Sequence, residues 1–342
     1  MSSNVIPTTT LGSGGPGAGP VVGVQGLGCM GMSEFYGETD TAEALATLDR
    51  ALELGVTLFD TADIYGNGHN EQLIGPFVQA NRDQVVLATK FAVDRRLDDP
   101  GYRGVRNDPP YIRQAVDASL SRLGVDVIDL YYMHRRDPQV PLAESVGAMA
   151  ELVQAGKVRY LGLSEVTGAE LREAHAVHPI TAIQSEWSLF SRDVERSAVP
   201  AAAELGVTFV PYSPLGRGFL TGSFANAGEL AADDFRQYQP RFTGDNAARN
   251  AALLAPVQKI AAAHGATAAQ VALAWVHQQA EVHDLAVVPI PGTRKRSRLE
   301  ENTAATALRL SPEELALLEP IAGQVAGDRY PDMSSTSAAR EG

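Results

Sequence analysis

The chain has 342 residues, of which 44% are hydrophobic and 20% are charged, so it can bury a large core and widespread disorder is not expected. Its 28 Lys and Arg residues stand against 41 Asp and Glu residues, and the net charge of -13 makes it a poor general binder of nucleic acids or anionic membrane surfaces. The single cysteine, Cys29, excludes an intramolecular disulfide and a cysteine-rich zinc site.

The ends of the chain differ in composition from the rest. Residues 1–20 are rich in Gly, Ser, Thr and Pro, and we expect a flexible N-terminal segment. Residues 326–342 are interpreted as a C-terminal tail whose last dozen residues fray. The composition of residues 21–325 is uniform, with no second linker, and this predicts one domain. With no secretory signal and no run of about 18 apolar residues, we expect a cytoplasmic protein that does not bind membranes.

Short apolar runs rich in β-branched residues alternate with longer stretches of helical periodicity. In chain order, strands are predicted over residues 27–30, 57–60, 85–89, 128–133, 158–163, 182–184, 208–212 and 286–289. Helices are predicted over residues 41–54, 70–78, 111–123, 142–155, 167–175, 198–205, 247–264, 267–279 and 297–306.

Eight strands bounded by helices favour an α/β fold, a single-domain (β/α)8 TIM barrel. Gly55, Gly124, Gly156 and Gly206 each follow a predicted helix, where a left-handed C-cap belongs. A doubly wound open sheet is the competing fold. Against it, no Gly-x-Gly-x-x-Gly motif follows an early predicted strand.

Polar residues end several of the predicted strands, at the face of such barrels that carries the chemistry. Asp60, Lys90 and His134 end three strands, and Tyr65 lies in the loop after Asp60. Each alone is more often structural: an aspartate that caps a turn, a lysine that reaches solvent, a histidine that satisfies a local hydrogen bond. Four such residues on one face predict a functional site.

These four side chains suit proton delivery to an oxygen. Tyrosine has an ordinary pKa of about 10, and a nearby ammonium group would favour its charged form. Lys90 could supply that charge, Asp60 could hold Lys90 in place, and His134 could orient a carbonyl oxygen. Because no side chain can carry a hydride, carbonyl reduction at this site requires a nicotinamide cofactor.

Four stretches of the sequence resemble the aldo-keto reductase family: residues 27–32, 59–66, 161–165 and 290–302. Their order and spacing are similar over residues 20–325, and the family's tetrad falls on Asp60, Tyr65, Lys90 and His134. The resemblance implies a barrel with an N-terminal β-hairpin and long loops. It also implies NADPH-dependent reduction of an aldehyde or ketone, with Tyr65 as the proton donor. The variants Gly-Cys-Met-Gly-Met and Gly-Leu-Ser-Glu are most similar to a branch that includes pyridoxal reductases and perakine reductase.

The resemblance also implies a set of cofactor-binding residues. Ser164, Glu165 and Gln184 would lie at the nicotinamide carboxamide, Tyr212 would stack on the ring, and a strap over 213–220 would cover the pyrophosphate. The full set is Met30, Ser164, Glu165, Gln184, Tyr212, Ser213, Leu215, Gly216, Arg217, Gly218, Thr293, Arg294, Arg298, Glu301 and Asn302. Glu165 replaces the asparagine of many relatives and can only accept a hydrogen bond.

Residues 294–298 form the densest basic cluster of the chain. Arginine side chains fit phosphate oxygens in a two-point manner, which suits an adenosine 2′-phosphate. A solvated basic loop is the alternative interpretation. By the resemblance, Thr293, Arg294 and Arg298 lie near that phosphate, and Glu301 and Asn302 near the adenine. Gly292 stands where many relatives have a lysine, so the dominant cation is left open.

The substrate side carries weaker signals. Candidate pocket residues are Tyr36, Phe91, Arg135 and Trp187, each of which could equally be an ordinary packing residue. The irregular segment 221–245 is either a lid or a partly disordered insertion. The histidines show no metal-binding spacing, so no metal is expected. Two other functions stay open: a regulatory subunit similar to potassium-channel β subunits, and an aldolase or isomerase that uses Lys90 as a Schiff-base amine. Neither the physiological substrate nor the oligomeric state follows from the sequence.

Overall fold

Seven parallel strands form the main sheet of the protein, which we describe from a computed structural model covering residues 5–12, 18–37, 39–95 and 104–341. Their order across the sheet is β3-β4-β5-β8-β9-β10-β11. Their bounds are β3 (Leu27–Gly28), β4 (Leu58–Asp60), β5 (Val86–Phe91), β8 (Ile128–Met133), β9 (Val158–Ser164), β10 (Ala182–Glu186) and β11 (Thr208–Tyr212).

The segment 286–290 closes this sheet into a barrel. On one side it pairs with β11, because Phe209 N donates to Ala286 O at 2.9 Å and Val288 N donates to Phe209 O at 2.9 Å. On the other side, Pro289 O accepts from Gly26 N at 2.9 Å, next to β3. The predicted eighth strand therefore lies in its expected place, although only Val287 forms a regular bridge. The predicted TIM barrel is confirmed.

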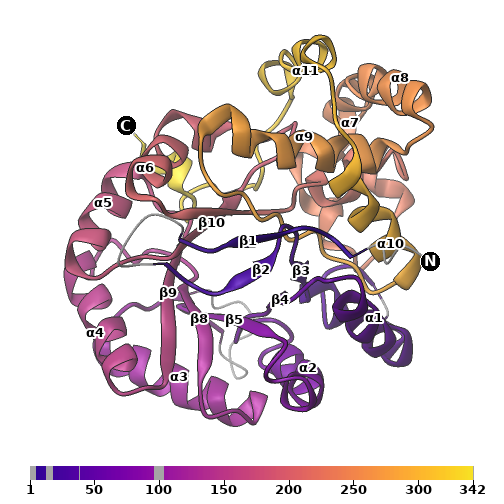
Figure 1. Ribbon diagram of the computed structural model, residues 1–342. Coiled ribbons are helices and arrows are strands. Elements are labelled where there is room, and N and C mark those ends of the chain that lie inside the picture. The colour runs from indigo at the N-terminus through magenta and orange to yellow at the C-terminus, as the bar shows by residue number, and fades with distance from the viewer. Residues whose placement is uncertain (1–4, 13–17, 38, 96–103, 342) are drawn as a thin grey trace.

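Helices surround the strands on the outside (Figure 1). They are α1 (Thr41–Glu53), α2 (His69–Ala80), α3 (Pro109–Leu123), α4 (Leu142–Gln154), α5 (Gly168–Val177), α6 (Ala198–Leu205), α9 (Ala268–His283) and α10 (Arg296–Ala304). Three more lie beyond α9: α7 (Gly244–Ala252), α8 (Ala255–His264) and α11 (Pro312–Leu318). Within the described part of the chain, no helix combines the length and apolar character that crossing a membrane requires.

The predicted helix over 247–264 is divided in two. Helix α7 ends at Ala252 and α8 begins at Ala255, with Pro256 in the first turn of α8. Proline lacks the N–H that a continuous helix would need at this point, and its ring crowds the preceding turn. The short helix α11 was not predicted.

A hairpin covers the N-terminal end of the barrel. Strand β1 (Thr8–Thr10) pairs antiparallel with β2 (Val21–Gly23), and Gly12 N donates to Thr208 Oγ1 at 2.7 Å. Leu11 and Val22 pack against the apolar side chains inside the barrel. The expected flexibility of residues 1–20 is therefore wrong for residues 8–12, whereas residues 1–4 and 13–17 lie outside the described part. A second small ribbon joins β6 (Val93–Asp94) to β7 (Gly104–Val105).

Alternation along the strands separates two hydrophobic layers. Leu58, Ala88 and Leu130 belong to the cluster inside the barrel, while Phe59 and Leu87 belong to the larger cluster between strands and helices. Successive strand residues point to opposite faces. Side chains two positions beyond an inward-facing residue therefore also face inward, which places Asp60 and Lys90 inside the barrel.

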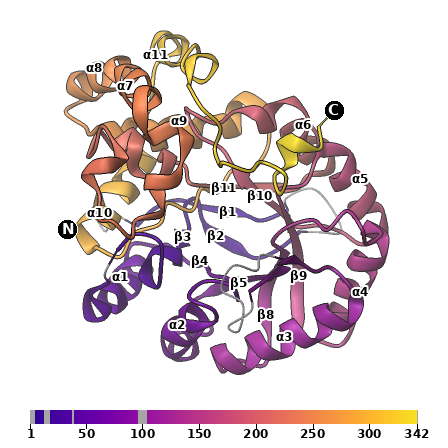
Figure 2. The same ribbon diagram turned by 180° about the vertical axis from the view of Figure 1, so that it is seen from behind.

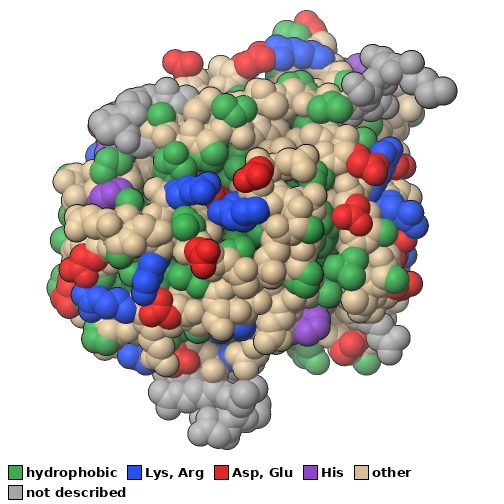
Figure 3. Space-filling model, turned by 60° about the horizontal axis from the view of Figure 1, so that its bottom comes forward, with side chains coloured by type: hydrophobic (Ala, Val, Ile, Leu, Met, Phe, Trp, Pro, Cys, Tyr) green, Lys and Arg blue, Asp and Glu red, His purple; other side chains and the backbone are tan. Residues whose placement is uncertain are grey.

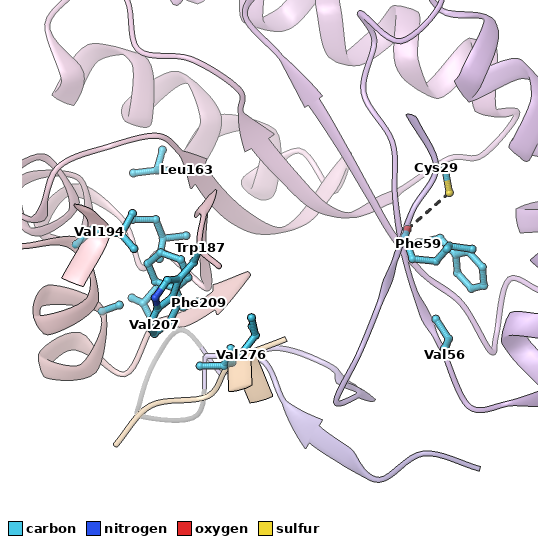
Figure 4. Close-up of a cluster of buried hydrophobic side chains, with 14 of the residues drawn as sticks. Cys29, Val56, Phe59, Leu163, Trp187, Val194, Val207, Phe209 and Val276 are labelled. Carbon is cyan, nitrogen blue, oxygen red and sulfur yellow. Dashed lines mark hydrogen bonds between the residues drawn. The ribbon is translucent and has the colours of Figure 1, made fainter. Parts of the chain in front are cut away.

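The same alternation corrects two predicted pocket residues, Phe91 and Trp187. Both have no exposed surface. Phe91 follows the inward-facing Lys90, so it faces the helix layer, where its ring stacks on Tyr131 at 5.1 Å. Trp187 packs against Phe209 at 4.9 Å in the cluster drawn in Figure 4, and its Nε1 donates to Glu195 at 2.9 Å. They are core residues and do not line an open pocket.

The C-terminal residues also differ from expectation. Figure 2 shows the chain running from α11 back across the barrel to end near α6. Thr336 and Ser337 are buried, with 0% and 1% of their surface exposed. The expected fraying of residues 332–342 is thus wrong for these positions, because the segment packs against the barrel.

Acidic and basic side chains are interspersed on the face drawn in Figure 3. Surface ion pairs such as Arg113–Glu151 and Arg172–Glu204, each at 2.6 Å, join neighbouring helices. Exposed pairs of this kind contribute little to stability. They do show that much of the basic charge on the surface is matched by carboxylates.

Candidate active site

The tetrad residues predicted from sequence meet at one end of the barrel. Asp60 is the last residue of β4, Lys90 lies near the end of β5, and His134 follows β8. Because the three strands are parallel neighbours in the sheet, their carboxyl ends share one rim. Tyr65 reaches the same place from the loop after β4.

Lys90 is the hub of this group and is fully buried. Its ammonium group pairs with Asp60 Oδ1. It also donates to Thr61 O at 2.8 Å and to the Tyr65 hydroxyl at 3.3 Å. The second oxygen of Asp60 accepts from Gln184 Nε2 at 2.8 Å. Contacts in three directions leave Lys90 little freedom to move away from Tyr65.

The charge states of Lys90 and Tyr65 follow from burial and from each other. Burial lowers the pKa of Lys90, but Asp60 and Tyr65 raise that pKa by more, so the amine stays charged. Burial raises the pKa of Tyr65, and Lys90 offsets only part of that effect. The expected acidification by Lys90 is thus present but outweighed, and the phenol is protonated at neutral pH. A charged Lys90 is a poor Schiff-base nucleophile.

His134 also lies next to Tyr65, with the centres of the two rings 6.0 Å apart and the rings nearly perpendicular. Burial lowers the pKa of His134 well below its usual range, and the nearby charges of Arg135 and Lys90 act in the same direction. The imidazole is therefore neutral. Its Nδ1 is buried and has no hydrogen-bond partner among the described residues. A neutral imidazole can donate one hydrogen bond to an oxygen atom near Tyr65.

Asn70 positions the loop that carries Tyr65, and the sequence alone did not reveal it. Its side chain is buried at the start of α2, where it accepts from Thr61 Oγ1 at 2.6 Å. Its amide donates to Cys29 O at 2.9 Å and to Ser33 Oγ at 2.8 Å. The only signal in the sequence is a polar residue in the first turn of a helix that closely follows Tyr65.

The residues expected at the nicotinamide fall into two groups. Ser164 and Gln184 lie beside the tetrad, since Ser164 Oγ accepts from Arg135 at 3.3 Å and Gln184 contacts Asp60. Met30 packs against the cluster that contains Tyr65. Glu165 instead binds Arg329, which lies in the segment near the C-terminus, at 3.0 Å, a partner that the sequence did not reveal.

The strap after β11 has an unusual backbone. Ser213, Gly216, Arg217 and Gly218 all have left-handed φ angles, of 48°, 54°, 58° and 89°. Leu215, which is also among the predicted cofactor-binding residues, is partly buried. Glycine adopts such angles without strain, and the loop closes on itself, because Gly216 N donates to Ser213 O at 2.9 Å and Gly218 N to Leu215 O at 3.0 Å. The Arg217 side chain points inward, where it binds Glu186 at 3.1 Å.

The segment 221–245 packs over the strap instead of extending into solvent. It contains the short 3-10 helices Ala227–Glu229, Phe235–Tyr238 and Pro240–Phe242. Phe235 N donates to Phe35 O at 3.3 Å, and its ring contacts Tyr36 at 5.3 Å. The structure thus places this segment as a bridge between the strap and residues 35–36, which favours the lid over a disordered insertion.

The predicted phosphate-binding arginines have different surroundings. Arg294 donates to the backbone oxygens of Gly31, Tyr36 and Gly37 at 2.8–3.1 Å, so it holds the loop before α1. Arg298 is exposed at the start of α10 and forms no ion pair with any described residue. Nearby, Thr293 and Asn302 are buried and Glu301 is partly exposed. Arg298 is therefore the freer of the two arginines.

Comparison with known proteins identifies the family. A model of the Aldo/keto reductase family matches residues 26–322. The chain belongs to the aldo/keto reductase family. Among solved structures, this family member is similar to the glycerol dehydrogenase AKR11B4 from Gluconobacter oxydans, with 28% identity, 97% of this chain and 99% of that chain covered, and a TM-score of 0.82.

Two further structures are similar over nearly their whole length. One is the holo form of the aldo-keto reductase AKR11C1 from Bacillus halodurans, with 26% identity, 96% and 99% of the two chains covered, and a TM-score of 0.74. The other is an aldo/keto reductase from Klebsiella pneumoniae in complex with NADP and acetate, with 26% identity, coverage of 95% and 99%, and a TM-score of 0.68.

Removal of Lys90 tests the buried ion pair. Lys90→Met should lower the free energy of unfolding by about 3–5 kcal/mol, because it leaves the carboxylate of Asp60 buried without its cation. Adding Asp60→Asn removes that uncompensated charge and should recover most of the loss. Urea denaturation of the two variants and the parent chain measures both effects. An equal cost for Lys90→Met with and without Asp60→Asn would contradict the pairing.

Proposed function

We propose that this protein is an NADPH-dependent oxidoreductase that reduces the carbonyl group of an aldehyde or ketone to an alcohol, in the cytoplasm. The observation that carries this proposal is the position of the Tyr65 hydroxyl, 3.3 Å from the amine of Lys90 and beside the ring of His134. A hydroxyl in these surroundings can give up a proton and leave a stabilised phenolate. The complex of the Klebsiella pneumoniae relative with NADP supports the choice of cofactor.

The residues around the tetrad fit a dinucleotide. At one end, the buried Nδ1 of His134 has no hydrogen-bond partner among the described residues, and the Tyr65 hydroxyl lies close to the same ring. At the other end, the Arg298 side chain and the backbone N–H groups of Ser297 and Arg298 in the first turn of α10 suit a phosphate, whereas the N–H of Arg296 already donates to Glu43. Ser164, Gln184 and Tyr212 would hold the nicotinamide end, and the strap would cover the pyrophosphate. When bound, NADPH supplies the hydride.

The chain's own residues supply the proton and stabilise the group that loses it. Tyr65 donates its proton to the carbonyl oxygen as negative charge develops there, and Lys90 stabilises the resulting phenolate. Asp60 holds Lys90 charged and in place, and His134 donates a hydrogen bond to the same oxygen. Tyr36 and Arg135 remain the candidates for contacts with the rest of the substrate. The sequence variants noted above favour a substrate range similar to that of the pyridoxal and perakine reductases.

Substitution of the proposed proton donor is the direct test. Tyr65→Phe should lower the rate of aldehyde reduction by about 100- to 10,000-fold, because the acid is lost while the ring remains. The affinity for NADPH, measured by quenching of protein fluorescence, should stay within about twofold. Turnover close to that of the parent chain would show that Tyr65 is not the acid.

The two arginines of the basic segment should differ in their effect on cofactor choice. Arg298→Ala should weaken NADPH binding by about tenfold and leave NADH binding nearly unchanged, because only NADPH carries the 2′-phosphate. Arg294→Ala is the matched control: it frees the loop before α1 and should affect both cofactors equally. Titration of each variant with each cofactor measures the effect. A selective effect of Arg294→Ala, with none from Arg298→Ala, would reverse the assignment.

A further inference from the structure

The C-terminal segment, residues 329–341, lies on the same face of the barrel as the tetrad. In Figure 2 this yellow segment crosses the end of the barrel beyond β10 and ends beside α5 and α6. Its first residue, Arg329, is only 2% exposed. An arginine so deeply buried requires carboxylates close by, because removal of its charge from water is costly.

Arg329 binds Glu165, the residue directly after β9, in a two-point contact. Its Nη1 donates to Oε1 at 3.0 Å and its Nη2 to Oε2 at 3.1 Å. Asp193 Oδ2 lies 3.3 Å from the same guanidinium, and Glu186 Oε2 lies 3.8 Å away. Burial alone would raise the pKa of Glu165, but Arg329 and its other donors lower the pKa to about 2. Glu165 is therefore an ionised carboxylate that binds the C-terminal segment through Arg329.

The oxygens of Glu165 have no lone pair left for a ligand. Besides Arg329, Oε1 accepts from the Tyr212 hydroxyl at 2.7 Å and from Glu186 N at 3.3 Å. Oε2 accepts from Ser337 N at 3.0 Å and more weakly from the Ser337 hydroxyl at 3.4 Å. A carboxylate oxygen accepts about two strong hydrogen bonds. The carboxamide contact that the family resemblance implies for Glu165 is thus already replaced by protein donors.

A second contact joins the C-terminal segment to Tyr212. The Tyr330 hydroxyl lies 3.3 Å from the Tyr212 hydroxyl and accepts from Arg217 Nη2 at 2.7 Å. The guanidinium of Arg217 lies over the ring of Tyr330, 4.8 Å from its centre. The hydroxyl of Tyr212 is thus held by two neighbours, Glu165 and Tyr330. Both of these depend on residues 329–337.

We propose that Arg329 is a positioning residue: through Glu165 it fixes the hydroxyl of Tyr212 and so orients the ring against which the nicotinamide of NADPH stacks. The proposal rests on the function proposed above, because that function assigns the stacking role to Tyr212. In this proposal, Glu165 holds the Tyr212 hydroxyl and does not contact the cofactor directly. The C-terminal segment is then part of the cofactor site. No contact between Arg329 and the cofactor is needed.

A double-mutant cycle on NADPH affinity tests this inference. Arg329→Met removes the charge at similar length, and Tyr212→Phe removes only the hydroxyl through which Arg329 acts. Each single variant should raise the Kd for NADPH by about tenfold, and the double variant should raise it by no more than either single variant, because both break the same chain of contacts. Fluorescence titration gives each Kd, and circular dichroism and thermal melting confirm that each variant is folded.

Arg82→Met is the matched control. Arg82 also binds a carboxylate in a two-point contact, with Asp129 at 2.7 and 2.9 Å, and it touches neither Glu165 nor Tyr212, so its loss should leave the Kd within about twofold. Kd values that multiply in the double variant, or a folded Arg329→Met with the parent Kd, would overturn the inference. If Arg329→Met does not fold, the NADPH affinities of Tyr212→Phe and Glu165→Gln test the inference instead. Affinities equal to that of the parent chain in both variants would overturn the inference. A parent chain that binds no NADPH would overturn the proposed function as well, so the two failures are distinguishable.

Discussion

The buried ion pair between Lys90 and Asp60 determines the character of the site. Two opposite charges inside the barrel are costly to desolvate, and the cost is offset only because Thr61, Tyr65 and Gln184 complete the hydrogen bonds of the pair. With Lys90 held charged, Tyr65 can stay protonated in a buried position and still lose its proton during a reaction. His134 is kept neutral in part by the same charge.

The site is assembled from parts of the chain that are far apart in sequence. The tetrad comes from the first half of the barrel, the strap follows β11, and the segment 221–245 reaches back to contact Tyr36. Arg294, from the last barrel loop, holds the backbone of the loop before α1. The C-terminal segment then binds Glu165 at the end of β9. The carboxyl end of the barrel is therefore a continuous structure and not a set of independent loops.

The barrel and the tetrad could be predicted from the sequence because their signals are local. Apolar runs mark the strands, and polar residues at strand ends must share one rim once the strands are parallel. The role of Arg329 could not be predicted, since nothing near it in sequence indicates that Glu165, 164 positions away, is its partner. Phe91 and Trp187 were wrongly predicted to line the pocket because aromatic character does not reveal which face of a strand a residue occupies. The direction of the Tyr65 pKa was missed for a related reason: a sequence shows charged neighbours but not the degree of burial.

The proton donor is tested most directly by the pH dependence of a single turnover, in which protein preloaded with NADPH reduces an aldehyde between about pH 5.5 and 9. The raised pKa of Tyr65 and the lowered pKa of His134 place both titrations outside this window, so the rate of the chemical step should be constant across it. A rate that changes around the ordinary histidine pKa of about 6.5, and no longer does so in His134→Gln, would identify His134 as the acid and contradict the assignment to Tyr65.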